Sequence, residues 1–112
     1  MTEFTQEQLN QLAVFAGLTV GPNENWYYCN TSSAQMLMFC RRQEWLPHLK
    51  PEQADLVLRA MSNRYYIKID VQLGGHTFVH IINDYESEWW PEAVCLAALE
   101  LVAKEPSNNP AT

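Results

Sequence analysis

Residues 65–82 read YYIKIDVQLGGHTFVHII, and this stretch carries the clearest strand signal in the chain. From Tyr65 to Leu73 the odd positions are aromatic or aliphatic, and most of the even positions between them are polar. An alternation of period two is typical of a strand that buries one of its faces. The pair Gly74–Gly75 then indicates a tight turn. We therefore predict a β-hairpin whose strands span residues 65–73 and 76–83.

The register of this hairpin has two alternatives, which differ in the length of the turn. A two-residue turn would place His80 opposite Ile69. A three-residue connection would pair Ile69 with Ile81 and Asp70 with His80. We favour the second register because it gathers β-branched side chains on the core face. It also sets opposite charges across the other face, which is worth about 0.2–1 kcal/mol.

Helix signals occur on both sides of the hairpin. Thr5 and Gln8 have the spacing of a capping box, as do Ser32 and Gln35, and Pro51 and Pro91 suit a first helical turn. Helical spacing of apolar residues follows each signal. The segment 25–29, which contains three consecutive aromatic residues, is interpreted as a short strand or as an extended lead-in to the second helix. The predicted helices cover residues 6–16, 33–45, 51–61 and 91–103.

Length and composition predict one α+β domain. The chain has 112 residues, of which 47% are hydrophobic, enough for one core. We expect a small antiparallel sheet packed with about four helices, in αβα sandwich-like layers. Residues 1–104 would form this domain. Residues 105–112 contain two prolines, two asparagines and no large apolar residue, which is typical of a flexible C-terminal tail.

Charge and cysteine content exclude several classes of function. The formal net charge of -6 opposes direct binding of nucleic acid, since like charges repel the phosphate backbone. No apolar run approaches the ~20 residues that span a bilayer, so no membrane partner is expected. The three cysteines lack metal-ligand or redox spacing and lie among apolar residues, which predicts reduced, mostly buried thiols. The N-terminus lacks a signal-peptide pattern, so we expect a cytoplasmic location.

The order of motifs from residue 26 to residue 103 resembles the phage ABA sandwich domain family. The motifs are Tyr28-Cys29-Asn30 with the helix predicted after it, the helix start Pro51-Glu52-Gln53, and Trp89-Trp90 before an Ala/Leu-rich helix. This resemblance implies helices on both sides of a small antiparallel sheet and an origin in a phage or prophage. The location would then be the cytoplasm of the host cell. The resemblance implies no chemistry and no site residues.

The histidines and cysteines are the first candidates for a catalytic site. A cysteine nucleophile would need His76 or His80 as a base, but the apolar setting of each cysteine favours core packing. A small hydrolase or metal-dependent enzyme using His76, His80 and Asp70 is the alternative function. Zinc needs three or four convergent ligands, so we favour a plain cross-strand contact between His80 and Asp70. No catalytic residue, metal or cofactor is predicted.

The candidate binding site consists of Asp84, Glu86, Glu88 and Trp89. The three carboxylates alternate along a predicted acidic turn, residues 83–88, before an aromatic residue of the type enriched at binding hot spots. This composition suits a protein partner with a basic surface. We therefore predict a small acidic, non-enzymatic protein-binding module. In the phage setting it would be an accessory protein that inhibits a host defence factor, as anti-CRISPR proteins do, and a homodimer is left open.

Overall fold

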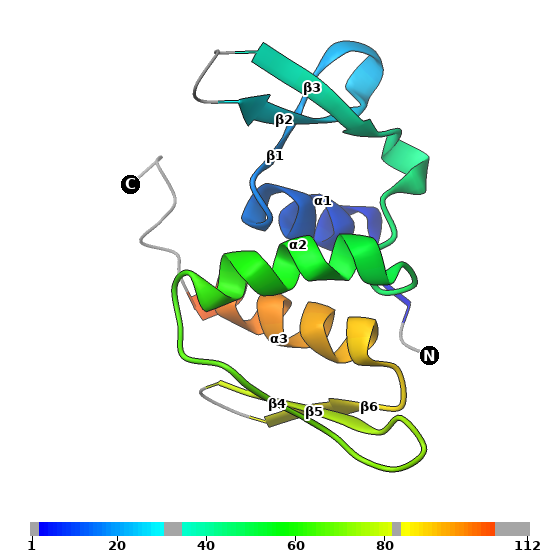
Figure 1. Ribbon diagram of the computed structural model, residues 1–112. Helices are drawn as coiled ribbons and strands as arrows, with labels where there is room; N and C mark the ends of the chain where they lie inside the picture. Colours follow the sequence, from blue (N-terminus) through cyan, green and yellow to red (C-terminus); the bar gives the residue numbers. More distant parts are fainter. Residues whose placement is uncertain (1–2, 31–34, 82–83, 105–112) are drawn as a thin grey trace.

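Three α-helices form a central layer of the protein, with a small antiparallel sheet on either side (Figure 1). The structure is a computed structural model that describes residues 3–30, 35–81 and 84–104. The helices are α1 (Gln6–Phe15), α2 (Pro51–Ser62) and α3 (Trp90–Lys104). The α+β class is therefore confirmed. The predicted αβα layering is wrong, because the helices lie inside and the sheets outside.

Each sheet has three strands in sequential order. The first sheet contains β1 (Leu18–Val20), β2 (Trp26–Asn30) and β3 (Gln35–Cys40). The second sheet contains β4 (Lys68–Val71), β5 (Thr77–His80) and β6 (Asp84–Ser87). A short 3-10 helix, η1 (Pro22–Glu24), lies between β1 and β2 in the chain, and a second one, η2 (Arg42–Glu44), follows β3. The lone short strand predicted at 25–29 is thus β2, the centre of a complete sheet.

The three helices with strong local start signals form as predicted. The Thr5 hydroxyl accepts a hydrogen bond from the Gln8 amide at 3.1 Å, and the Gln8 side chain accepts one from the Thr5 amide at 2.9 Å. Pro51 and Pro91 occupy the first turns of α2 and α3, where their missing N–H groups leave no intrahelical hydrogen bond unmade. The helices end within one residue of the predicted positions.

The helix predicted at residues 33–45 is wrong. Strand β3 occupies Gln35–Cys40 and pairs with β2, and the 3-10 helix η2 follows it. A short apolar run such as MLMFC has no periodicity that separates strand from helix. The neighbouring β2 is aromatic and prone to form strands, so it supplies a pairing edge that decides the outcome. Residues 31–34, where the predicted helix cap falls, lie outside the described residues.

Both predicted hairpin registers are wrong, and the strands predicted at 65–73 and 76–83 are shorter than expected, although the assignment of faces within β4 and β5 is right. Ile69 lies opposite Val79 and Lys68 opposite His80, and Gln72 donates to the His76 carbonyl at 2.8 Å. The preferred register is therefore shifted by two residues, which leaves every side chain on the same face. Gly74 and Gly75 both have positive φ values, which glycine adopts without steric cost.

The acidic turn predicted at residues 83–88 is also wrong where the structure describes it. Residues Asp84–Ser87 form strand β6, which pairs with β5. The alternation of charged and uncharged residues there has the period of a strand. Tyr85 lies opposite Val79 on the helix-facing side, so Asp84 and Glu86 face outward. Asn83 lies outside the described residues, as does the predicted tail at 105–112.

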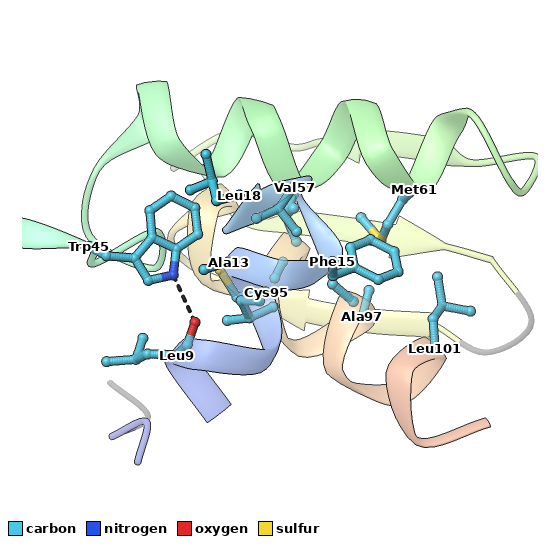
Figure 2. Close-up of a cluster of buried hydrophobic side chains, with 14 of the residues drawn as sticks. Leu9, Ala13, Phe15, Leu18, Trp45, Val57, Met61, Cys95, Ala97 and Leu101 are labelled. Atoms are coloured by element: carbon cyan, nitrogen blue, oxygen red, sulfur yellow. Dashed lines mark hydrogen bonds between the residues drawn. The ribbon is translucent and has the colours of Figure 1, made fainter. Parts of the chain in front are cut away.

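The core lies within the helical layer (Figure 2). It extends to the inner faces of both sheets, with Leu18 and Trp26 on the first and Val79 on the second. Small residues such as Ala97 and Ala98 on α3 are fully buried and allow the helices to pack closely. The Trp45 indole crosses to α1 and donates to the Leu9 carbonyl at 2.8 Å. Cys40 and Cys95 are buried free thiols, as predicted, whereas the Cys29 side chain lies outside the described structure.

Candidate functional site

The outward surface of the second sheet gathers most of the residues singled out by sequence. Along β5, Thr77 and Val79 are buried on the face of the sheet that packs against the helices. Phe78 and His80 alternate with them and lie on the opposite, outward face. We call this surface the outer face and define it by the side chains of three adjoining strands. They are Lys68 and Asp70 on β4, His76, Phe78 and His80 on or beside β5, and Asp84 and Glu86 on β6.

His80 connects all three strands of the second sheet. Its Nδ1 lies 2.7 Å from Asp84 Oδ1, and its Nε2 lies 3.0 Å from Asp70 Oδ2. The predicted contact between His80 and Asp70 is therefore confirmed, although the two residues are diagonal neighbours because Asp70 pairs with Phe78. The ammonium of Lys68 lies 3.6 Å from the same Asp70 oxygen.

The charge state of His80 depends on these two carboxylates. Hydrogen bonding to Asp84 is the largest effect that raises the pKa of His80 above 6.5, and Asp70 adds to it. Partial removal of the ring from water acts in the opposite direction. When protonated, the imidazolium donates to a carboxylate from each ring nitrogen.

A second histidine–carboxylate contact lies at the other end of β5. His76 Nε2 is 3.3 Å from Glu86 Oε2. The Phe78 ring lies between the two histidines, edge-on to His76 at 4.9 Å and stacked on His80 at 6.2 Å between ring centroids. Phe78 therefore separates the two charge clusters, and each histidine has its own acidic partner.

The predicted binding residues lie along β6 and the turn into α3. The side chains of Asp84 and Glu86 are 72% and 64% exposed, and Glu88 is exposed beyond the end of the strand. Trp89 is 37% exposed. The Ser87 hydroxyl accepts from the Trp89 amide at 3.1 Å and donates to the Glu92 carboxylate at 2.8 Å. This side chain fixes the turn that joins β6 to α3.

The residues of the alternative enzyme only partly converge. Asp70 and His80 are in contact, but His76 lies on the far side of Phe78 and pairs with Glu86. Both ring nitrogens of His80 already contact carboxylates. Within residues 3–30, 35–81 and 84–104, no three histidine, cysteine or acidic side chains are grouped so that they could hold a metal ion.

Two further titratable groups are buried near the start of α3. Burial lowers the pKa of His48, while the nearby Glu92 opposes this shift, and His48 Nδ1 has no hydrogen-bond partner among the described residues. Burial raises the pKa of the Cys95 thiol to about 12, and Glu92 adds to the shift. A thiol with this pKa is protonated at neutral pH and is a poor nucleophile.

A hollow of about 280 Å³ lies between the C-terminal ends of α1 and α2. It is lined by apolar side chains, among them Phe15 and Leu56, and by Arg59 and Arg64. The Arg64 guanidinium lies 4.5 Å from the centre of the Phe15 ring, and Arg59 pairs with Asp55 at 2.8 Å. No histidine or carboxylate of the described residues lines this hollow, so it lacks the acid–base groups of the alternative enzyme.

The close grouping of the histidines with the acidic residues was not predicted from the sequence. The histidines at positions 76 and 80 and the acids at 84 and 86 all have even spacing, which places them on one face once both segments are strands. The prediction of a turn at 83–88 hid this relation.

None of the described helices is both long enough and apolar enough to cross a membrane.

The chain matches no protein-family model, no curated protein sequence and no solved structure. The phage resemblance therefore stays a prediction.

Proposed function

We propose that this chain is a small acidic protein-binding module that takes a basic, extended segment of a partner protein along β6. The observation that carries this proposal is the exposed pair Asp84 and Glu86, two residues apart on an edge strand and followed by Glu88 and Trp89. We call these four residues the acidic edge. Its function in this proposal is recognition, with no catalytic step.

The geometry of an edge strand supports an extended ligand. β6 lies at the end of the order β4-β5-β6, so one side of its backbone has no neighbouring strand in that sheet. A peptide added there would gain main-chain hydrogen bonds and place every second side chain on the outer face. Lysine or arginine at alternate positions would then lie beside Asp84 and Glu86. Trp89 would supply the aromatic anchor.

The charge of the outer face supports a basic ligand. Three carboxylates lie there with one lysine, and Glu88 is exposed beside them. Exposed charges of this kind accelerate encounter with an oppositely charged partner and are screened over ~10 Å at 0.1 M salt. Association should therefore slow as salt is added. For the biological setting we propose a phage accessory protein that occupies the basic surface of a host defence factor.

A synthetic peptide with lysine at alternate positions tests this function before any partner is identified. A second peptide of the same composition, with its lysines adjacent instead of alternate, is the control. Binding is measured by fluorescence anisotropy of a labelled peptide at low and high salt. We expect tighter, salt-sensitive binding of the alternating peptide.

Two sets of protein variants complete the test. Changing Asp84, Glu86 and Glu88 to their amides should mainly slow association, and Trp89→Ala should speed dissociation, at a cost of about 2 kcal/mol for a hot spot. The matched control makes the same charge change away from this surface, in Glu7→Gln, Glu52→Gln and Glu100→Gln. Equal weakening by both triple variants would show general charge attraction and would rule out the acidic edge.

A further inference from the structure

Strand β3 exposes three large apolar side chains in succession. Met36, Leu37 and Met38 are 46%, 52% and 52% exposed. The strand register places Met38 opposite Tyr27 and Leu37 opposite Tyr28, so the exposed side chains project from both faces of the first sheet. β3 lies at the end of the order β1-β2-β3, which leaves its outer backbone edge without a partner in that sheet.

The other described edge strands have features that discourage pairing with a second copy of this chain. β4 carries Lys68 and Asp70, β6 carries Asp84 and Glu86, and β1 is only three residues long. Charged side chains and short length are common protections of a sheet edge. β3 has six residues with no charge and no proline. Among the described edges it is the one without either protection.

The charge distribution indicates what kind of surface would cover β3. Residues 25–40 contain no charged side chain, and from residue 18 to residue 44 two glutamates and two arginines cancel. The rest of the chain therefore carries the whole net charge of -6. A second copy of this chain would be repelled by most of the surface and could approach without repulsion at the first sheet.

We propose that the protein forms a two-fold symmetric dimer through antiparallel pairing of β3 with β3 of a second copy. A two-fold axis at Leu37 places Met36 of each copy opposite Met38 of the other. The two β3 strands then pair edge to edge, and the first sheets of the two copies join into one continuous sheet. A two-fold contact needs only one self-complementary patch. Methionine side chains adapt readily to such packing. This inference is independent of the proposed function.

The position of the second sheet is compatible with this dimer. It lies on the opposite side of the helical layer from the first sheet (Figure 1), along a molecule whose longest dimension is 42 Å. Charge repulsion in physiological salt is screened beyond about 8–10 Å. The acidic outer faces of the two copies therefore stay remote from each other and remain accessible in the dimer.

Sedimentation and light scattering of the full chain over a range of concentrations test the dimer. The measured mass should rise from 12.9 kDa to twice that value. Hydrogen exchange in the peptide covering residues 35–40 should slow over the same concentration range, because the β3 amides at the free edge gain partners. A chain that stays monomeric at all concentrations, or that grows into open-ended assemblies, overturns the proposal.

A pair of charge variants tests the register itself. In the variant M36K/M38K, lysine faces lysine across the axis, whereas in M36K/M38E lysine faces glutamate. Both introduce two charges at the same exposed positions. The dimer dissociation constant should be roughly tenfold higher or more for the first, since like charges opposite each other destabilise strand pairing. The control Leu73→Lys, at a fully exposed turn position, should dimerise like the natural chain.

Circular dichroism of each variant establishes that the monomer is folded before the masses are compared. Equal dissociation constants for M36K/M38K and M36K/M38E would overturn the pairing centred on Leu37. Loss of the dimer in Leu73→Lys would overturn the assignment to β3.

Discussion

At His80, a single imidazole joins the three strands of the second sheet. The ring belongs to β5, and its two nitrogens contact carboxylates from β4 and β6. The contacts are partly exposed, and exposed ion pairs contribute little individually to stability. Instead, the contact between His80 and Asp84 fixes the position of the Asp84 side chain at the acidic edge.

Protonation of His80 should make stability depend on pH. The pKa of His80 is raised in the folded protein, so the stabilising contribution is complete below 6.5 and is lost as pH rises through the folded pKa. Urea unfolding of the natural chain and of His80→Gln, compared at about pH 6 and pH 8, measures this effect. The natural chain should lose more stability on this rise in pH than the variant does.

His48 changes stability with pH in the opposite direction to His80. The comparison with His80→Gln is therefore needed to isolate the effect of His80. Burial lowers its pKa, so its contribution is lost as pH falls below 6.5. The difference between the natural chain and His80→Gln removes this common background. Identical pH profiles for the two proteins would mean that the contacts of His80 with Asp84 and Asp70 do not stabilise its charged form.

The buried thiols give a second prediction at this scale. Cys40 and Cys95 are enclosed, and burial raises the pKa of both, that of Cys95 to about 12. Reaction with a thiol reagent should therefore be slow in the folded protein and fast in urea. The variant Cys29→Ser leaves only these two thiols to be counted. Rapid labelling of either one under native conditions would contradict their burial.

Among the elements, α1 shows how far a local signal can determine structure. The Thr5 hydroxyl and the Gln8 side chain satisfy backbone amides that the first helical turn leaves without partners. These groups are three residues apart, so the signal is readable in the sequence. β3 is the contrasting case, because its pairing partner β2 and not its own composition makes it a strand.

Loss of the α1 cap should destabilise the whole protein measurably. Thr5→Ala removes the hydroxyl acceptor and should lower the free energy of unfolding by about 1 kcal/mol. Thr5→Ser keeps the acceptor and should retain most of the stability. Urea unfolding followed by circular dichroism measures both. An alanine variant as stable as the serine variant would mean that the capping box does not contribute to the free energy of unfolding.

In the whole molecule, the helical layer lies between the two sheets and couples the stability of one to that of the other. α1 contacts β1 of the first sheet, α3 contacts β5 and β6 of the second, and the three helices contact one another. Trp26 and Trp45 are buried toward the first sheet, and Trp89 and Trp90 lie beside the second. One continuous core thus connects the dimer surface that we propose on β3 to the acidic edge on β6.

A cavity in the helical layer should therefore unfold both sheets together. Leu12→Ala removes a fully buried side chain from the core and should cost about 2–5 kcal/mol. Hydrogen exchange along a urea series, followed in peptides that cover β2 and β5, reports the two sheets separately. Both should show one urea midpoint, shifted equally by Leu12→Ala. Two separate midpoints would mean that the sheets unfold independently.

The sequence by itself determined those features whose causes lie within a few residues of each other. Caps and first-turn prolines specify three helices, and the period-two pattern specifies which side chains of the hairpin face the core, including the contact between Asp70 and His80. The four predicted binding residues were chosen from composition, but the place of Asp84 and Glu86 on a strand was not predicted. A two-residue shift of register leaves that pattern unchanged, so sequence could not choose the register.

Tertiary structure alone decided the layer order, the strand identity of residues 35–40 and 84–87, and the hairpin register. The two strands and the hairpin register depend on hydrogen bonds to a strand elsewhere in the chain, and a short segment has too little propensity of its own to specify them. The helices lie inside because α3 is apolar around most of its circumference and must be covered on several sides. The helices α1 and α2 and the strands β5 and β6 contact α3 and provide that cover.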